Sequence, residues 1–167
     1  MPNYASLPDY ISYLETVSKR SNKFLIGNFY SYEYAFDRTE KDFEITRFYD
    51  RQPLVYVIAQ GPTENTVVGF NFHQLPVRSR LLWLTRFDKF TGIKEDDSRN
   101  IFYYEFVREM FKKAIYGIRL YRKERIKKLR QIDSTKMYDL VRYYSNTYYG
   151  ASIDAIEVRY ASFNVYK

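Results

Sequence analysis

A single histidine limits the acid–base chemistry that this chain can perform. His73 is the only histidine among 167 residues, and the carboxylates best suited to orient its ring are Asp50 and Glu33. His73 lies at the end of an aromatic run, where a histidine is more commonly a hydrogen-bonded structural residue. A catalytic histidine and a structural histidine are therefore both open interpretations.

Other reactive groups are missing or lack the spacing that their chemistry needs. With no cysteine and one histidine, disulfides, thiolate metal sites, cysteine nucleophiles and two-histidine metal sites are excluded. There is no Gly-x-Ser-x-Gly elbow and no glycine-rich phosphate loop, and Glu95, Asp96 and Asp97 do not have calcium-loop spacing. We expect no catalytic residue, no metal and no cofactor, and hence a protein that is not an enzyme.

Positive charge is concentrated in one segment. The formal net charge is +7, and residues 99–142 carry 13 basic and five acidic side chains. A long helix predicted over residues 101–132, with Gly117 as a position at which it could bend or split, would align most of the basic residues in one stripe. Such a stripe suits nucleic-acid phosphates or an acidic protein groove, and a solvated face is the simpler alternative. The stripe comprises Arg108, Lys112, Arg119, Lys123, Lys127 and Arg130, with Arg122 beside it.

The elements that would position these residues divide into a β-rich part and a helical part. Residues 24–36 are dense in aromatic and β-branched side chains, residues 43–48 form a short strand pattern, and residues 53–58 and 66–73 form a hairpin around a turn at 61–65. Helices are predicted over 6–20, from Pro76 to Phe87, over 101–132 and after Ser134.

These patterns predict one α+β domain over residues 1–167. It has a helical N-terminal segment (1–22), a β-rich part (23–75) with a small, bent, SH3-like antiparallel sheet, and a helical part (76–167). No apolar run approaches the roughly 18 residues of a membrane helix, and the first residues lack the order of a signal peptide. We therefore expect no membrane partner.

Aromatic residues make up 20% of the chain, with 19 Tyr, 13 Phe and one Trp. A single domain of this size buries only about 70% of its unfolded surface, so some of these rings should lie in protein interfaces. The C-terminal residues Tyr160, Phe163 and Tyr166 are the predicted interface set, because their spacing would let them line one edge or one helical side.

Several blocks between Lys23 and Phe87 carry a resemblance to a known family. The chain resembles tailed-bacteriophage virion proteins that are described as DNA end protector, or head-completion, proteins. The similarity covers about two thirds of the chain and is looser at Tyr121, Arg122, Arg125 and residues 153–163. The blocks are Lys23–Tyr34, then Tyr49-Asp50-Arg51-Gln52-Pro53-Leu54-Val55, then Gly69-Phe70-Asn71-Phe72-His73-Gln74-Leu75-Pro76 with Arg78 and Arg80.

The resemblance implies a virion component at the head–tail junction, assembled in the host cytoplasm and present in several copies, in a ring or a similar assembly. Its partners would be other virion proteins (portal, neck or tail components) and double-stranded DNA, whose packaged ends it would contact or protect while helping to complete the head. The matching motif residues suggest roles in folding rather than catalysis: Pro53 opens a strand, Gly69 permits close backbone approach, and Asp50, Asn71 and His73 pair through buried hydrogen bonds.

Three alternatives remain. The chain could be a tail or baseplate structural protein whose basic residues meet acidic protein neighbours, or a free nucleic-acid-binding accessory protein. A nuclease is the weakest of the three, because no carboxylate cluster with metal-site spacing accompanies the basic residues.

Overall fold

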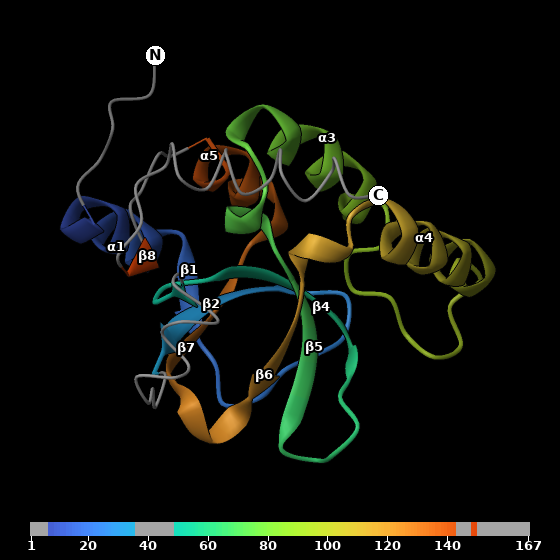
Figure 1. Ribbon diagram of the computed structural model, residues 1–167, viewed down its shortest axis with the longest axis horizontal. Coiled ribbons are helices and arrows are strands. Elements are labelled where there is room, and N and C mark those ends of the chain that lie inside the picture. The colour runs from blue at the N-terminus through green and yellow to red at the C-terminus, as the bar shows by residue number, and fades with distance from the viewer. Residues whose placement is uncertain (1–6, 36–48, 143–147, 150–167) are drawn as a thin grey trace.

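The structure is a computed structural model that describes residues 7–35, 49–142 and 148–149 (Figure 1). Within these ranges, no helix combines the length and apolar content needed to cross a membrane. The helices are α1 (Leu7–Thr16), α3 (Val77–Asp88), α4 (Asn100–Lys113) and α5 (Met137–Leu140), with 3₁₀ turns η1 (Phe72–Gln74), η2 (Ile115–Gly117), η3 (Lys123–Arg125) and η4 (Ser134–Lys136). The strands are β1 (Ser18–Arg20), β2 (Phe29–Tyr34), β3 (Tyr49–Asp50), β4 (Leu54–Gln60), β5 (Thr66–Asn71), β6 (Ile118–Arg122), β7 (Ile126–Ile132) and β8 (Tyr148–Tyr149).

The main sheet is antiparallel and contains six strands in the order β1-β7-β2-β4-β5-β6, while β3 and β8 form a separate pair. The predicted α+β class with a small antiparallel sheet is therefore confirmed, and the sheet is not closed. Helices α3 and α4 are inserted between the paired strands β5 and β6, and the three-residue turn η3 connects β6 to β7.

One face of the sheet carries the main hydrophobic core. The four helices lie on this side of the sheet in Figure 1. Alternate residues of β4, Leu54, Tyr56 and Ile58, point into this core, as period-two alternation requires. Phe87 of α3 is fully buried, and its ring lies 4.6–5.4 Å from the rings of three strand or η1 residues and 4.9 Å from that of Phe106 in α4. The helices are thus fixed to the sheet largely by aromatic packing.

The other face carries a smaller core rich in tyrosine. Tyr32 and Tyr34 of β2 reach the ring of Tyr121 in β6, at centroid distances of 5.4 and 5.1 Å, although β4 and β5 lie between these strands in the sheet. The hydroxyl of Tyr34 also accepts the backbone N–H of Arg122 at 3.1 Å. The sheet is therefore strongly bent, as predicted, with the tyrosine core on its concave side.

The single helix predicted over residues 101–132 is wrong. Helix α4 ends at Lys113, Ala114 leaves helical geometry with φ −140° and ψ 33°, and the rest of the segment forms η2, β6, η3 and β7. Gly117, at the end of η2, lies close to the core, because a Cβ there would lie 2.5 Å from the Phe70 ring. The predicted N-terminal helix is also shorter than expected, since residues 18–20 are strand β1. Residues 43–48 lie outside the described ranges.

A carboxylate on α4 forms an ion pair with α3, and this contact should make the stability of the protein depend on pH. Glu109 lies 2.7 Å from the guanidinium of Arg86 on α3 and 2.9 Å from the ammonium of Lys113. The hydrogen bond from Arg86, and then that from Lys113, lowers the pKa of Glu109 from 4.5 to about 2. Because its pKa is lower in the folded state, ionised Glu109 stabilises the fold above the unfolded-state pKa, and this contribution is lost as the pH falls from about 4.5 to about 2.

We expect Glu109→Gln to reduce the fall in melting temperature that the wild type shows across this acidic range. The measurement is a series of thermal melts between pH 2 and pH 7 (the ordinary range around the carboxyl pKa values). Glu105→Gln, a change at an exposed residue of the same helix, is the control. Parallel curves for the wild type and Glu109→Gln would contradict the assigned role.

Candidate functional site

The motif residues Asp50, Asn71 and His73 meet in one buried hydrogen-bond network. The Asp50 Oδ2 atom lies 2.7 Å from His73 Nδ1 and accepts a hydrogen bond from Asn71 Nδ2 at 2.9 Å. The Asn71 Oδ1 atom accepts the backbone N–H of His73 at 3.0 Å, which caps η1. The predicted buried pairing of these three residues is confirmed. Glu33, the other carboxylate considered for His73, instead lies 2.8 Å from Lys128.

Tyr10 of α1 extends this network on the other side of the His73 ring. Its hydroxyl lies 3.4 Å from His73 Nε2. Burial raises the pKa of Tyr10, and the nearby Asp50 charge raises it further, so the hydroxyl keeps its proton. With its proton retained, the Tyr10 hydroxyl can donate a hydrogen bond to His73 Nε2, while the other ring nitrogen, Nδ1, faces Asp50.

The Asp50–His73–Tyr10 sequence of contacts resembles a catalytic relay in connectivity, but the three residues are only 7%, 2% and 0% exposed. A general base must come within hydrogen-bond distance of its reactant, and α1 covers this histidine. The geometry favours the structural interpretation of His73: the network holds α1, β3 and η1 together beside the sheet.

Two further motif residues have the roles that the sequence predicted. Pro53 immediately precedes β4, and its carbonyl oxygen accepts a hydrogen bond from the Ser31 hydroxyl at 2.7 Å. Gly69 of β5 pairs with Val57 of β4 and Arg119 of β6, and a Cβ at Gly69 would lie 2.3 Å from Val55 Cγ1 and 3.4 Å from the Tyr121 ring. The close approach predicted at Gly69 is thus confirmed.

Sequence reasoning missed four residues that complete the buried polar region. Gln52 donates its backbone N–H to Asp50 Oδ1 at 3.0 Å and its side-chain amide to Ser31 at 3.0 Å. Buried Arg80 donates from Nε to the Leu75 carbonyl oxygen at 3.0 Å. Tyr10 fits the apolar periodicity of its helix, which conceals its polar contact. The contacts of Tyr10 with His73 and of Gln52 with Ser31 join distant segments, so spacing along the chain carries no signal for them, whereas the contacts of Gln52 with Asp50 and of Arg80 with Leu75 are local.

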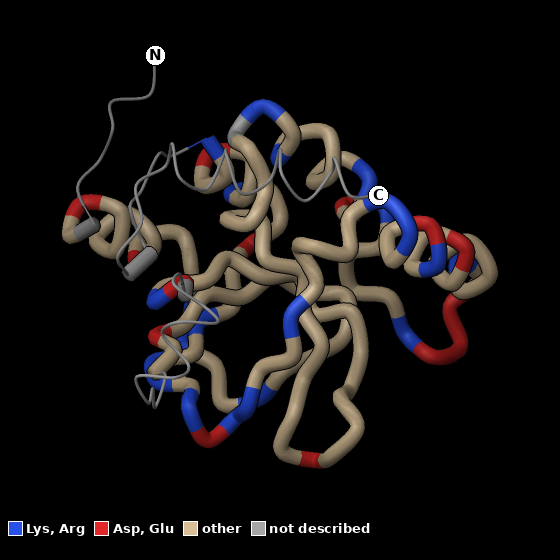
Figure 2. Tube along the Cα trace, in the orientation of Figure 1, with Lys and Arg blue, Asp and Glu red and all other residues tan. Residues whose placement is uncertain are grey.

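The structure disperses the predicted basic stripe. Arg108 and Lys112 lie on α4, whereas the other members lie on β6, η3 and β7, at the opposite side of the molecule in Figures 1 and 2. The cause is the break after Lys113, which replaces the helix with two strands that pair in different parts of the sheet. The members on the sheet are Arg119 and Arg122 of β6, Lys123 of η3, and Lys127 and Arg130 of β7.

Three of these cations already have structural partners, and the first, Lys123, donates from Nζ to the Glu64 carbonyl oxygen at 2.8 Å. The Arg130 guanidinium donates to the Ser18 hydroxyl at 2.7 Å and to two backbone carbonyl oxygens, which fastens β7 to the end of α1. Arg119 donates to Gln74 Oε1 at 3.1 Å and to the Ile118 carbonyl oxygen at 3.0 Å. Their charges therefore contribute to folding as well as to the surface potential.

New neighbours join the remaining basic residues. Strand β1 pairs with β7, which brings Lys19 and Arg20 beside it, and the following loop contributes Lys23. We call this group the β7 basic surface; it appears as the concentration of blue at the lower left of Figure 2. Its members are Lys19, Arg20, Lys23, Arg122, Lys123, Arg125, Lys127 and Lys128.

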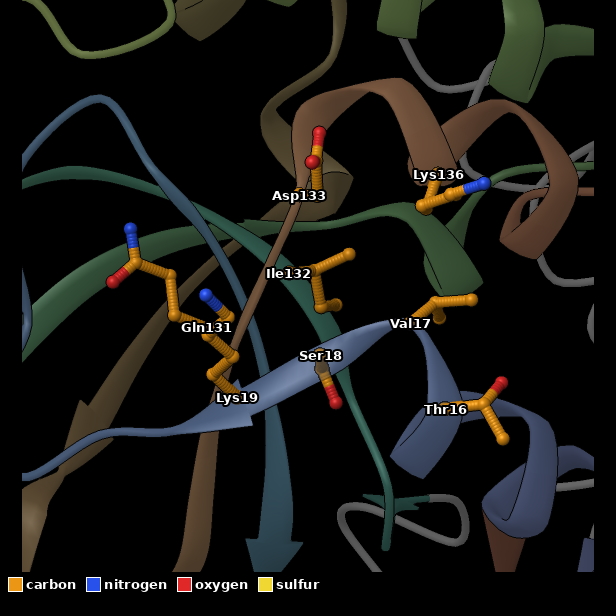
Figure 3. Close-up of a pocket in the computed structure, with 8 residues that line it drawn as sticks. All are labelled: Thr16, Val17, Ser18, Lys19, Gln131, Ile132, Asp133 and Lys136. Carbon is orange, nitrogen blue, oxygen red and sulfur yellow. The ribbon is translucent and has the colours of Figure 1, made fainter.

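Three hollows of the surface lie along β7. The first, about 440 Å³, is drawn in Figure 3 between the α1–β1 and β7–η4 connections, and Asp133 lines it together with Lys19 and Lys136. Another, about 330 Å³, is lined in part by Glu33, Arg51 and Lys127. Each of these hollows therefore combines positive and negative side chains.

The third hollow differs in charge. It has a volume of about 430 Å³, and its described lining contains three lysines, Lys23, Lys123 and Lys128, with no carboxylate. Phe24 and the β7 residues Ile126 and Leu129 form its apolar part. Lys128 stands in the left-handed region with φ 53°, at a bulge in the pairing of β7 with β2, and its ammonium lies 2.8 Å from Glu33. We call this the lysine hollow.

The lysine hollow has the chemistry of an anion-binding surface. Clustered ammonium groups beside a concave surface attract phosphate oxygens, and strained backbone of the kind at Lys128 is common at functional sites. Glu33 offsets one of the three positive charges. No group of three potential metal-ligating side chains occurs among the described residues. The predicted interface set, Tyr160, Phe163 and Tyr166, lies outside them.

Comparison with known proteins adds no assignment: no family model, no curated protein and no solved structure matches this chain. The resemblance to phage head-completion proteins therefore stays a prediction that depends on the motif residues themselves.

Proposed function

We propose that this protein is a non-enzymatic component of a tailed-bacteriophage virion, placed at the head–tail junction, where its β7 basic surface contacts the phosphates of packaged DNA. The observation that carries the DNA contact is the lysine hollow with the cations around it. The virion assignment is supported by the motif, whose residues Asp50, Asn71 and His73 form a buried structural network.

Phosphate contacts predict a steep dependence of affinity on salt. Each neutralised phosphate contributes about 0.9 to the slope of log affinity against log salt, and such contacts carry little base specificity. We expect the triple variant Lys23→Gln, Lys123→Gln and Lys127→Gln to flatten this slope by roughly 2–3 for duplex DNA. Lys128 is left in place because its ion pair with Glu33 also supports the bulge.

The measurement is fluorescence anisotropy of a labelled 20-base-pair duplex (about two helical turns) with the full chain at several salt concentrations. The matched control removes the same charge elsewhere, through Arg78→Gln, Lys89→Gln and Lys94→Gln on α3 and the loop after it, all at exposed positions. A wild type without affinity for duplex DNA, or equal slopes for both triple variants, would contradict the DNA contact.

A tail or baseplate structural protein is the second candidate, favoured by the large apolar side chains exposed on α4, including Ile101, Phe102 and Tyr104. Antibody labelling of purified particles that contain the protein distinguishes a position at the head–tail junction from one in the tail or baseplate. Label at the junction between head and tail supports the proposal, and label at the tail or baseplate supports the alternative.

A further inference from the structure

The outer side of α4 exposes apolar residues at the spacing of a helix-pairing seam. Ile101, Tyr104, Arg108 and Phe111 follow one another at intervals of three, four and three, and exposed Ile115 follows in η2, beyond the end of the helix. Residues at these intervals form one stripe along a helix, as the a and d positions do in a coiled coil. We call these five residues the α4 outer stripe.

This stripe is distinct from the side by which α4 packs on its own domain. Tyr103, Phe106 and Met110 are buried in the main core, and Glu109 faces Arg86 of α3. In contrast, the side chains of Ile101 and Tyr104 are 65% and 63% exposed, and those of Phe111 and Ile115 are 44% and 42% exposed. Helix α4 therefore has two apolar sides, and the part of the chain that the structure describes packs against only one of them.

Arg108 defines the charge that a partner must carry. It lies in the middle of the stripe, between Tyr104 and Phe111, so a helix that covers the apolar residues also covers its guanidinium. Burial of an unpaired cation is strongly unfavourable, and the partner must therefore present a carboxylate at that layer. Exposed Lys112, beside Phe111, adds a second positive charge at the same surface.

A second copy of the chain fits this requirement poorly. The five residues of the stripe include no carboxylate, and the exposed carboxylate nearest in sequence, Glu105, lies at its edge, so two copies paired through the stripe would leave Arg108 facing mainly apolar and cationic residues of its partner. The stripe is also short, because a helix of 14 residues is about 21 Å long. That length suits the docking of one helical segment into a surface rather than a stable dimer.

We propose that the α4 outer stripe binds an amphipathic, acidic helix of a neighbouring protein, with a carboxylate of that helix paired to Arg108. This inference is independent of the DNA contact, since it concerns a different surface of the molecule. The probe is a synthetic helical peptide of about three heptads, whose a and d positions are Leu and Ile except for a Glu at one central a position. The positions that flank its apolar stripe are also Glu. A matched peptide carries Lys at every Glu position.

Fluorescence anisotropy with the full chain should show that the acidic peptide binds at least about tenfold more tightly than the basic one, as an added close charge pair predicts. Arg108→Glu should reverse this preference, because it places a carboxylate in the central layer. Arg78→Glu, an equal charge change at an exposed position of α3, should leave the preference as in the wild type.

The double variant Tyr104→Gln and Phe111→Gln should weaken binding of the acidic peptide by about tenfold or more, because it removes the apolar contacts of two layers. Circular dichroism checks that this variant stays folded. Equal affinity of the wild type for both peptides, no binding of either peptide, or a preference unchanged by Arg108→Glu would overturn the proposal. Wild-type dimers in sedimentation that Phe111→Gln dissociates would also overturn it and would identify a second copy as the occupant.

Discussion

Replacement of Asp50 with alanine should lower the free energy of unfolding by about 3–5 kcal/mol, because it removes a buried acceptor that several polar groups share. The carboxylate accepts hydrogen bonds from Asn71 and Gln52 and contacts His73 at 2.7 Å. Without it, three buried polar groups lose their acceptor, and each carries a desolvation penalty. Urea denaturation followed by tyrosine and tryptophan fluorescence measures the change.

Asp96→Ala is the matched control, because Asp96 is exposed in the loop before α4 and should change stability by less than about 0.5 kcal/mol. If Asp50→Ala does not fold, Asp50→Asn keeps the shape of the side chain and should still destabilise by about 1–3 kcal/mol through loss of the charge-assisted hydrogen bonds. A loss below about 0.5 kcal/mol in both variants would show that the network does not stabilise the fold.

Gly69→Ala should destabilise the protein by about 2–3 kcal/mol, a large effect for one added methyl group. The new Cβ would lie 2.3 Å from Cγ1 of Val55, which is buried in the neighbouring strand, and 3.4 Å from the Tyr121 ring. Val55 is β-branched and its χ1 angle is stiff, so it cannot easily move aside. Either the strands separate locally or the tyrosine core shifts.

A double-mutant cycle tests this cause directly. Val55→Ala alone leaves a cavity and should cost about 2 kcal/mol. When Val55→Ala is combined with Gly69→Ala, the added methyl group enters the space that Cγ1 occupied, so the two losses should fall short of additivity by at least about 1 kcal/mol. Additive losses would show that the contact with Val55 is not the cause of the destabilisation.

The elements that sequence analysis predicted well are those whose signals are local. Strands β4 and β5 are an apolar run and its hairpin partner on either side of a turn, and α3 begins directly after Pro76. In each case the residues that define the element lie within about 20 positions of one another, so turn chemistry and side-chain periodicity are sufficient.

The helix prediction failed for the segment after α4, because the intrinsic helix preference of its residues differs from the strand pairing that the folded protein imposes. Lys, Arg and Leu favour helices, and their intervals between Arg108 and Arg130 also suit one. Pairing with β5 and β2 overrides that preference, and a strand partner so distant in sequence leaves no local pattern. The alternation of apolar and basic residues in Ile118–Arg122 is the one signal that pointed to a strand.

The candidate sites were predictable to different degrees. Asp50, Asn71 and His73 were paired correctly because hydrogen-bonding side chains in a buried motif have few other partners. The lysine hollow was not predicted as a site, since Lys23 joins Lys123 and Lys128 only through the way the chain folds around β7. The α4 outer stripe could not be predicted, because apolar residues occur on two sides of that helix and the sequence does not show which side packs on the core.

The strand order has a consequence for how this chain folds during synthesis. Strand β2 lies between β4, which follows it closely, and β7, which pairs Ile132 with Phe29 from the far end of the described sequence. Strand β1 has β7 as its partner in the sheet, so neither of the first two strands can complete its hydrogen bonds until residue 132 leaves the ribosome. Such a high contact order slows folding and leaves the tyrosines of β2 accessible in the nascent chain, where chaperones would meet them first.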